Sequence, residues 1–378
     1  MIRKRVIVIG PTLLFIAVLA VVSVPFVQAS GGGSFLGSLH HIATVGSTVP
    51  ANGDVNPYGV AVVPDSVGNL VQGDVLVSNF NAVSNLQGTG TTIVQVAPNG
   101  TTTLFASITR ASLPGACPGG VGLTTALAVL QRGWVVVGSL PTKDGTAATA
   151  KAGCLIVLDS TGHPVETFAG SLINGPWDMA ADDQGANASL FVTNVLNGTV
   201  AGNGQVVNEQ TVIRIDLSVP HAGNGMPERE STTVIGSGFS ARTDPLALVI
   251  GPTGLAFNGS NGADTLYVAD SLNNRIAAIP DALHRQTSAH TGNDLTSNGF
   301  LNDPLGMTLA PNGDVLTTNG NNGKVVETTP TGTQIDKKFL DRTGTPPGSG
   351  CLFGLTILPD NSGIYFVDDC TNTLNSLT

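Results

Sequence analysis

The sequence predicts an all-β fold, a six-bladed β-propeller, and three observations support this prediction. The chain of 378 residues contains 48 glycines, and only 11% of its residues are charged. Valine and threonine suit half-buried pleated strands, and glycine supplies the positive φ angles that tight hairpins need. Short apolar runs recur along the chain in a constant order, and one extra strand at 41–45 precedes the first of them.

One short motif recurs six times: a small or turn residue, an apolar residue, alanine or threonine, and an apolar or small residue. The copies begin at Gly59, Ala126, Asp178, Gly254, Gly306 and Gly354. The second copy can also be read at 122–125, so its register stays open. Each copy is followed by a second apolar run and then a third strand. The second runs end at Asn79, Ser139, Asn194, Asp270, Asn319 and Asp368.

Repetition distinguishes the two all-β architectures that this composition allows. Short strands in units of about 50 residues are typical of propeller blades, whereas a β-sandwich does not repeat one motif six times. The sixth unit stops after its third strand, at 373–377. A propeller that does not close its ring leaves edge strands exposed. We therefore expect the 41–45 strand to pair beside 373–377 as the outer strand of the last blade.

Residues 1–29 have the order of features found in a secretory signal peptide. Three basic residues, Arg3, Lys4 and Arg5, precede an apolar run, and Val27 and Ala29 form a small-residue cleavage site. The alternative is an uncleaved anchor, because the run approaches the ~20 apolar residues that span a bilayer. We expect cleavage after Ala29, a single mature propeller domain of residues 30–378, and a secreted or periplasmic protein without membrane attachment after cleavage.

Charge and cysteine content narrow the possible partners and the compartment. The net charge of −10 argues against nucleic-acid binding, which depends on clustered Lys and Arg. Four cysteines in an exported chain suggest two disulfides. Each pair borders the strands of one unit, the second or the sixth. The sequence therefore predicts Cys117–Cys154 and Cys351–Cys370.

Asparagine and aspartate are expected to gather at one mouth of the central channel. The first strand of a blade starts, and the second ends, on the same face, because the two strands are antiparallel neighbours. Tyr58 and Trp177 follow prolines at equivalent positions; they can line the same mouth or belong to the core. The polar candidates for ligand binding are Asn56, Asn79, Asn174, Asn194, Asp270, Asp303, Asn319 and Asp368.

Two interpretations of these polar residues stay open. Asn56, Asn174 and Asp303 can hold Ca²⁺ or another divalent cation, which takes carboxylate and amide oxygens. Alternatively, the short side chains hydrogen-bond the turn backbone after each second strand, which is the favoured explanation for the strand-end set. Insertions at 80–90, 140–152, 197–209 and 218–245 are expected to be loops, with 221–227 as a partial lid.

The fourth unit carries a family resemblance. The segment Gly254-Leu255-Ala256-Phe257 followed by 264–276 resembles an NHL repeat, and 303–319 is similar but lacks the Asn-Arg-Ile ending. Related six-bladed families are the gluconolactonase/regucalcin-like lactonases and the paraoxonase-like esterases. The resemblance to the lactonases implies a divalent cation at the channel mouth, with a glutamate near the start of the first blade. This chain has no glutamate there; the nearest acid is Asp54.

These observations lead to ranked hypotheses about function. The first is an exported, monomeric binding scaffold whose Asn/Asp-rich mouth binds a small molecule, a glycan or a protein. The second is a divalent-metal-assisted lactonase or esterase-type hydrolase that uses the same mouth, and the third is a structural or cell-surface interaction protein. A bound divalent ion with acidic ligands would favour the second hypothesis over the others.

Overall fold

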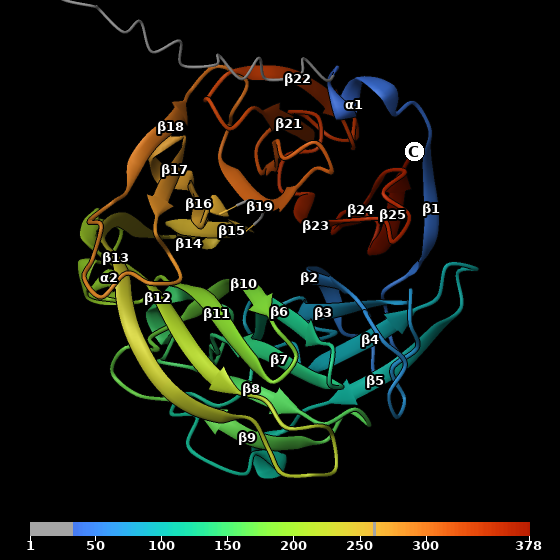
Figure 1. The fold of residues 1–378 in the computed structure, drawn as a ribbon, viewed down its shortest axis with the longest axis vertical. Helices are drawn as coiled ribbons and strands as arrows, with labels where there is room; N and C mark the ends of the chain where they lie inside the picture. Colours follow the sequence, from blue (N-terminus) through green and yellow to red (C-terminus); the bar gives the residue numbers. More distant parts are fainter. Residues whose placement is uncertain (1–32, 260–261) are drawn as a thin grey trace, which may run out of the picture. The chain divides into compact units, whose positions relative to one another are not determined.

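The computed structural model describes residues 33–259 and 262–378, and it contains the predicted six-bladed propeller (Figure 1). Six antiparallel sheets form a ring, and the first strand of each sheet lines the central channel. The predicted signal peptide, residues 1–29, lies outside the described residues. No helix within the described part of the chain has the length and apolar character needed to cross a membrane.

Each blade runs from an inner strand at the channel to an outer strand at the rim. Blade 1 contains β2 (Val55–Val62), β3 (Val75–Asn81), β4 (Thr92–Val96) and β5 (Thr102–Ser107). Blade 2 contains β6 (Leu123–Leu130), β7 (Trp134–Ser139), β8 (Cys154–Leu158) and β9 (Pro164–Phe168). Blade 3 contains β10 (Pro176–Asp183), β11 (Asn187–Asn194), β12 (Val207–Ser218), β13 (Glu228–Asp244) and β14 (Leu248–Ile250). Blade 4 contains β15 (Pro252–Asn258), β16 (Thr265–Asp270), β17 (Arg275–Pro280) and β18 (Asn293–Ser297). Blade 5 contains β19 (Pro304–Leu309), β20 (Val315–Asn319), β21 (Lys324–Thr328) and β22 (Gln334–Phe339). Blade 6 contains β23 (Leu352–Ile357), β24 (Ile364–Asp368), β25 (Thr373–Leu377) and β1 (Ile42–Ser47).

The short helices of the described residues lie before β1 or in the connections between strands. They are α1 (Phe35–Ser38), η1 (Arg110–Ser112), η2 (Ala147–Thr149), α2 (Thr199–Gly202) and η4 (Ser271–Asn273).

The recurring glycine of the sequence motif lies where neighbouring inner strands approach most closely. A Cβ atom on Gly254 would stand 2.0 Å from the carbonyl oxygen of Leu305, and one on Gly354 would stand 2.4 Å from that of Tyr58. Any larger residue at these positions would push adjacent blades apart. The register of blade 2, with Leu127 opposite Val137, shows that its copy of the motif begins at Ala126.

Hydroxyl groups near the ends of three second strands connect each odd-numbered blade to the next. Thr193 donates to the Thr253 carbonyl at 3.0 Å, and Thr318 donates to the Phe353 carbonyl at 2.7 Å. Ser78 makes the same contact, at 2.8 Å, with the carbonyl of Thr124. These bonds hold the first residues of the inner strands, which surround the channel mouth, in a constant arrangement.

The ring is closed as predicted. Strand β1 pairs antiparallel with β25, with Ile42 opposite Leu377 and Ser47 opposite Thr373, and becomes the outer strand of blade 6 (Figure 1, blue beside red). The preceding helix α1 lies against blade 5. Glu327 there accepts hydrogen bonds from the hydroxyl of Ser34 at 2.6 Å and from the backbone N–H groups of Phe35 and Leu36, both at 2.8 Å.

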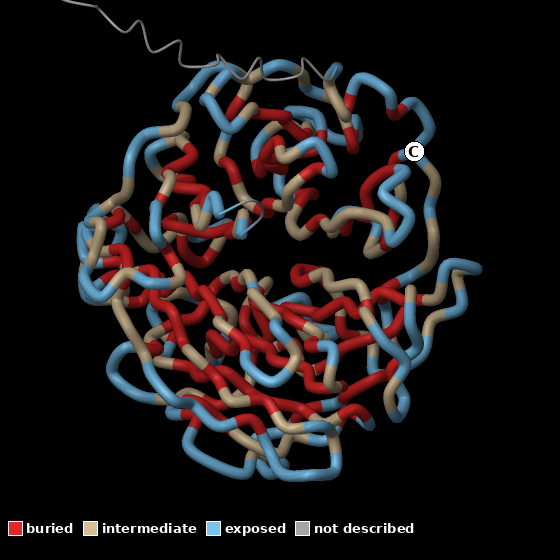
Figure 2. Tube along the Cα trace, viewed as in Figure 1, coloured by how far each residue is buried: buried red, intermediate tan, exposed pale blue. Residues whose placement is uncertain are grey.

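Burial decreases toward the outer strand of each blade. Every residue of β4 and β8 is buried, whereas no residue of the outer strands β18 and β22 is buried (Figure 2). Outer strands pair on one side only and need little apolar surface, which explains why their sequence signal is weak.

The structure corrects two expectations about the insertions. Residues 218–245 are not a loop, because 228–244 form β13, the outer strand of blade 3. Its glycines, serines and charged residues interrupt the apolar pattern by which a strand is recognised in a sequence. Residues 221–227 do not cover the mouth, because β12 has already run to the opposite face, where Ser218 pairs with Asn187 and the Trp134 Nε1 donates to the Pro220 carbonyl.

Candidate functional site

A cavity of about 530 Å³ lies at the face where the inner strands begin, and we call it the mouth cavity. Its wall is built from blades 1, 3, 4, 5 and 6 together with the insertion after β3. Of the residues that the sequence singles out, four line it: Asn56, Tyr58, Trp177 and Asp303. None of the six histidines of the chain lies in its lining.

Asn56 and Asp303 have left-handed backbone conformations, with φ angles of 60° and 58°. Asparagine and aspartate tolerate this conformation better than other residues with a Cβ atom. The backbone N–H of Asn56 donates to Oδ1 of Asn372 at 2.8 Å, and that of Asp303 donates to Oδ1 of Asn274 at 3.1 Å. A neighbouring blade thus holds the backbone N–H group of each residue, and both residues line the cavity.

Several oxygen acceptors of residues that line the cavity have no donor among the described residues. The buried side-chain oxygens of Asn56, Asn81 and Gln87 have no hydrogen-bond partner there. No described side chain or backbone group donates to the carboxylates of Asp303 or Asp369. Buried polar atoms are nearly always paired in proteins, and exceptions often mark the place of an ion or a ligand.

Both carboxyl groups have strongly raised pKa values. Burial raises the pKa of Asp303 to about 6, with a further contribution from the charge of Asp244 and an opposing one from Arg242. Burial and the nearby charge of Asp368 raise the pKa of Asp369 to about 7. Each group can therefore take up a proton near neutral pH, as a general base must.

An aromatic cluster forms one side of the cavity. The Tyr58 ring stacks on Phe353 with centroids 3.9 Å apart and on Phe80 at 4.5 Å, and Trp177 meets Tyr58 edge-on at 6.0 Å. Tyr58 and Trp177 are only 3% and 4% exposed, so they belong to the core and also line the cavity. Burial, together with the charges of Asp369 and Asp303, raises the pKa of Tyr58, and its phenol stays protonated.

Residues 242–250, which we call the mouth arm, contribute a part of the lining that the sequence does not reveal. They comprise the end of β13, a turn and β14. Nη1 of Arg242 lies 2.7 Å from Oδ2 of Asp244, and Nε2 of Gln87 donates to the Leu246 carbonyl at 2.5 Å. Blade 3 thereby meets the insertion of blade 1 beside the cavity.

The strand-end residues reach the expected face but do not line the cavity. Nδ2 of Asn79 donates to the Thr48 carbonyl at 3.0 Å, and a carboxylate oxygen of Asp270 lies 2.7 Å from Nε of Arg275. Each of the others bonds backbone or side-chain groups of the adjoining turns, namely Asn194, Asn319 and Asp368.

Asn174 also lies outside the cavity lining. Its Nδ2 donates to Oδ1 of Asn197 at 3.2 Å. Asp369, which does line the cavity, is a residue that the sequence analysis missed. Its only signal is its position between the end of β24 and Cys370.

Both predicted disulfides are present. Cys117–Cys154 and Cys351–Cys370 have Cα separations of 5.1 and 5.0 Å.

Asp341 and Asp368 lie close to the Cys351–Cys370 disulfide. Within the described ranges, these two acids and two cysteines are the one group of acids, cysteines or histidines with the spacing of a metal site. Because both sulfurs are engaged in the disulfide, they cannot act as metal ligands, and the group reduces to the carboxylates of Asp341 and Asp368.

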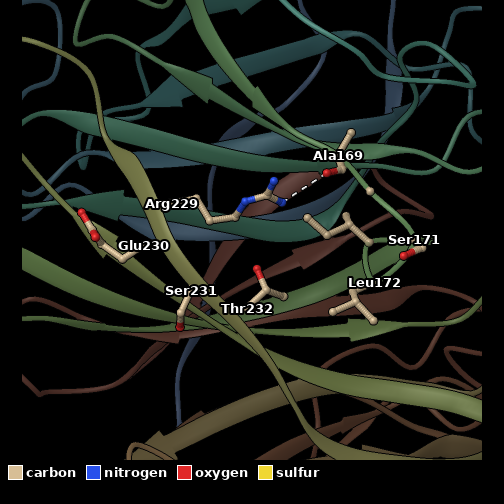
Figure 3. Close-up of a pocket in the computed structure, with 9 residues that line it drawn as sticks. Ala169, Ser171, Leu172, Arg229, Glu230, Ser231 and Thr232 are labelled. Carbon is tan, nitrogen blue, oxygen red and sulfur yellow. Dashed lines mark hydrogen bonds between the residues drawn. The ribbon is translucent and has the colours of Figure 1, made fainter.

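A second hollow, of about 330 Å³, lies on the outer side of the propeller between the start of β13 and residues 169–173 (Figure 3). Arg229 crosses it to donate to the Ala169 carbonyl at 3.2 Å, as the dashed line in Figure 3 marks. None of the predicted site residues lines this hollow. The mouth cavity is therefore the candidate functional site.

Comparison with solved structures supports the fold assignment. A gluconolactonase from Xanthomonas campestris is 14% identical, with a TM-score of 0.55 over 89% of this chain and 88% of that chain. A calcium-binding regucalcin from Agrobacterium tumefaciens is 13% identical, with a TM-score of 0.52 over 88% and 93%. A luciferin-regenerating enzyme is 12% identical, with a TM-score of 0.53 over 89% and 95%.

Sequence comparison adds no nearer relative. No protein-family model matches the chain, and no curated protein matches it. At these identities the structural likeness extends to the fold alone. The chain shares the six-bladed propeller fold of the gluconolactonase- and regucalcin-like proteins.

Proposed function

We propose that the mouth cavity binds a divalent cation and a small cyclic ester, and that the protein is a lactonase-type hydrolase. The observation that carries this proposal is the convergence of three oxygen acceptors without donors, from Asn56, Asp303 and Asp369, on one cavity. The gluconolactonases among the structural neighbours favour hydrolysis over binding alone.

The donor set suits a hard cation such as Ca²⁺, which prefers carboxylate and amide oxygens. Asn56 and Asp303 would hold it, because their side-chain oxygens lack other partners. Asn174 is not part of this set, since its amide is bonded to Asn197. A bound cation would polarise the carbonyl of the ester. A calcium-binding regucalcin among the neighbours agrees with this choice of ion.

Asp369 is the candidate general base. With a pKa of about 7, its carboxylate can accept a proton from a water molecule as that water attacks the ester carbonyl carbon. The bond between the carbonyl carbon and the ring oxygen then breaks, and the ring oxygen leaves as a hydroxyl group after taking up the proton that Asp369 holds. The aromatic side formed by Tyr58, Trp177 and Phe353 would position the ring of the substrate and exclude water from one of its faces.

The protein is proposed to work as an exported monomer in an oxidising compartment. Both cysteine pairs are disulfide-bonded, and disulfides persist outside the cytoplasm.

A binding scaffold without catalysis is the second candidate. It is favoured by the absence of histidine from the cavity lining, because histidine is the most frequent general base in enzymes. The same aromatic and amide groups would then bind a small molecule, a glycan or an exposed protein segment.

Metal content and turnover together test the proposal. The purified chain from Ser30 is analysed for bound metal, its Tm is measured with EDTA and with added Ca²⁺, and hydrolysis of a panel of lactones is followed by pH-stat. We expect one bound ion, a Tm that falls on chelation, and turnover that depends on the ion. D303N should lose both ion and turnover, whereas D369N should keep the ion and lose turnover.

The charge-matched control is D360N, because Asp360 lies in an exposed turn outside the cavity lining. It should behave like the wild type. Absence of a bound ion would overturn the metal site. Turnover that survives in D369N would overturn the role of the base, and an ion without turnover would leave the binding scaffold.

A further inference from the structure

The mouth arm presents one large apolar side chain to solvent at the edge of the cavity. Leu246 is 88% exposed and lines the mouth cavity. Two residues later the chain turns inward, and Leu248 and Val249 are buried in the cluster that contains Tyr58 and Trp177. The arm is therefore anchored in the aromatic side of the cavity and carries Leu246 at its tip.

Hydrogen bonds hold this exposed leucine in a defined place. Oδ1 of Asp244 accepts from the backbone N–H groups of Leu246 at 2.8 Å and Ala247 at 3.1 Å, and Gln87 donates to the Leu246 carbonyl. Arg242 in turn holds the other oxygen of Asp244 at 2.7 Å. The turn that carries Leu246 is therefore fixed both by the arm itself and by the insertion of blade 1.

The arm also contains backbone strain. Leu248 has a φ angle of 61°, in the left-handed region that a bulky residue rarely adopts. Such a conformation costs of order 1–3 kcal/mol and persists where the surrounding structure imposes it, often at ligand-binding segments. Here the burial of the Leu248 side chain and the pairing of β14 with β13 impose it.

Apolar surface continues from Leu246 into the cavity. The other apolar side chains of the arm, and one from blade 5, line the same space, namely Ala247, Val249, Ile250 and Leu305. The unpartnered oxygens belong to Asn56, Asp303 and Asp369, and to Asn81 and Gln87 of blade 1. The mouth cavity thus combines a polar group that would hold the reacting ester with an apolar rim.

We infer that the substrate is a lactone that carries an alkyl substituent, and that the mouth arm, through Leu246, binds this substituent. The inference rests on the proposed function, because it takes the reacting ester to lie at the oxygen acceptors of Asn56, Asp303 and Asp369. An alkyl chain leaving the cavity at the arm would cover the exposed Leu246 side chain and remove it from water. A ligand whose substituents all carry hydroxyl groups would leave that apolar surface without a partner.

The experiment measures affinity as a function of chain length, with and without turnover. γ-Lactams with alkyl substituents of increasing length are not readily hydrolysed, and they are titrated against the fluorescence of Trp177. The corresponding lactones are assayed for kcat/KM. A fully buried methylene contributes about 0.8 kcal/mol, which is roughly a fourfold gain in affinity. For the wild type we expect affinity and kcat/KM to rise about two- to fourfold per methylene.

Three variants test whether Leu246 causes the dependence of affinity on chain length. L246S should flatten the dependence on chain length, and L246M should restore it. The matched control is L104S, because Leu104 is 56% exposed on β5 and does not line the cavity.

The outcomes separate this inference from the proposed function. No dependence on chain length in the wild type, or a dependence that L246S leaves intact, would overturn the inference even if lactones are hydrolysed. Lactam affinity that rises with chain length and depends on Leu246, without hydrolysis of any lactone, would retain the alkyl-binding arm and reject the hydrolase.

Discussion

Asn56 and Asp303 occupy the same position in blades 1 and 5, directly before the proline near the start of the inner strand. Both are left-handed, and each donates its backbone N–H to an asparagine of the preceding blade, Asn372 or Asn274. The two asparagines are themselves left-handed, with φ angles of 53° and 52°. The same backbone arrangement therefore places the side chains of Asn56 and Asp303 at the mouth cavity, although their blades are separated by blade 6.

Asn56→Gly should remove a cation ligand without disturbing the fold. Blade 3 already has glycine at the equivalent position, Gly175, with a φ angle of 76°. Because glycine adopts this conformation without strain, we expect the Tm of the ion-free variant to stay close to that of the wild type. Affinity for Ca²⁺, measured by calorimetry, should fall about tenfold or more.

Asn361→Gly is the matched control for Asn56→Gly, since Asn361 is also left-handed, at 59°, but lies in an exposed turn. It should leave the affinity for Ca²⁺ unchanged. Equal affinities in the wild type and in N56G would show that the Asn56 oxygen is not a ligand.

The stability of the ion-free protein should decrease as the pH rises from about 4 to 8. Burial raises the pKa values of Asp303 and Asp369 above their values in the unfolded chain, so the folded state holds more protons in this range. The stability that these protons provide is lost as pH rises through the folded pKa values, about 6 and 7. D369N cannot lose a proton, and it should therefore be more stable than the wild type at pH 8.

Chemical denaturation at pH 5 and pH 8 checks the effect of D369N. The difference between the variant and the wild type should be small at pH 5 and larger at pH 8. A variant that gains no stability at pH 8 would contradict the raised pKa of Asp369. Added Ca²⁺ should oppose the trend, because the ion binds the deprotonated carboxylate of Asp303.

Glu327→Gln should weaken the attachment of the N-terminal segment to blade 5. Burial alone would raise the pKa of Glu327, but hydrogen bonds from Ser34, Leu36 and Phe35 outweigh it and hold the pKa below its ordinary value. The carboxylate therefore stabilises the fold above the unfolded pKa, and this contribution is lost as pH falls through the folded pKa. Bonds to charged groups typically contribute about 1.5–3 kcal/mol, and we expect a loss of this size at pH 7.

Urea denaturation measures the loss in E327Q, and proteolysis at 33–41 reports whether the segment has detached. S34A removes one of the same bonds and should give a smaller loss in the same direction. A variant with wild-type stability at pH 7 and a protected segment would contradict the role of Glu327.

The two disulfides should affect the mouth cavity differently. Cys351 and Cys370 are preceded by Gly350 and Asp369, which line it, whereas Cys117–Cys154 lies in blade 2 with neither neighbour in the lining. Replacing either pair by serine should cost about 3 kcal/mol or slightly more in unfolding free energy, by the chain-entropy relation. Only C351S/C370S should also weaken Ca²⁺ or lactam binding. Equal effects of the two replacements on binding would contradict this assignment.

Several elements of the fold could be predicted because their sequence signal is local. The motif beginning at Gly254 or Gly354 repeats because neighbouring inner strands leave no room for a Cβ atom. The closing strand could be predicted because the last unit lacks an outer strand. The outer strand β13 could not, because over residues 228–241 it pairs with β12 alone and carries no continuous apolar run.

The residues of the candidate site could be predicted only in part. Asn56, Tyr58, Trp177 and Asp303 follow from their place before or after a proline at the start of an inner strand. Asn79 and Asp270 follow the same rule for the ends of second strands, yet Asn79 bonds the Thr48 carbonyl and Asp270 bonds an arginine. Sequence position specifies the face of the propeller on which a residue lies but not the direction of its side chain.

By itself, the sequence of this protein determined the number of blades, the register of each inner strand except the second, the closure of the ring and the pairing of the cysteines. These features depend on periodicity and on contacts within one blade or between neighbouring blades. Only the tertiary structure decided which polar groups share one cavity, that Asp369 joins them, and that residues 242–250 reach them from blade 3. These relations connect blades far apart in the chain, and burial, which sets the pKa values of Asp303 and Asp369, exists only once the ring has closed.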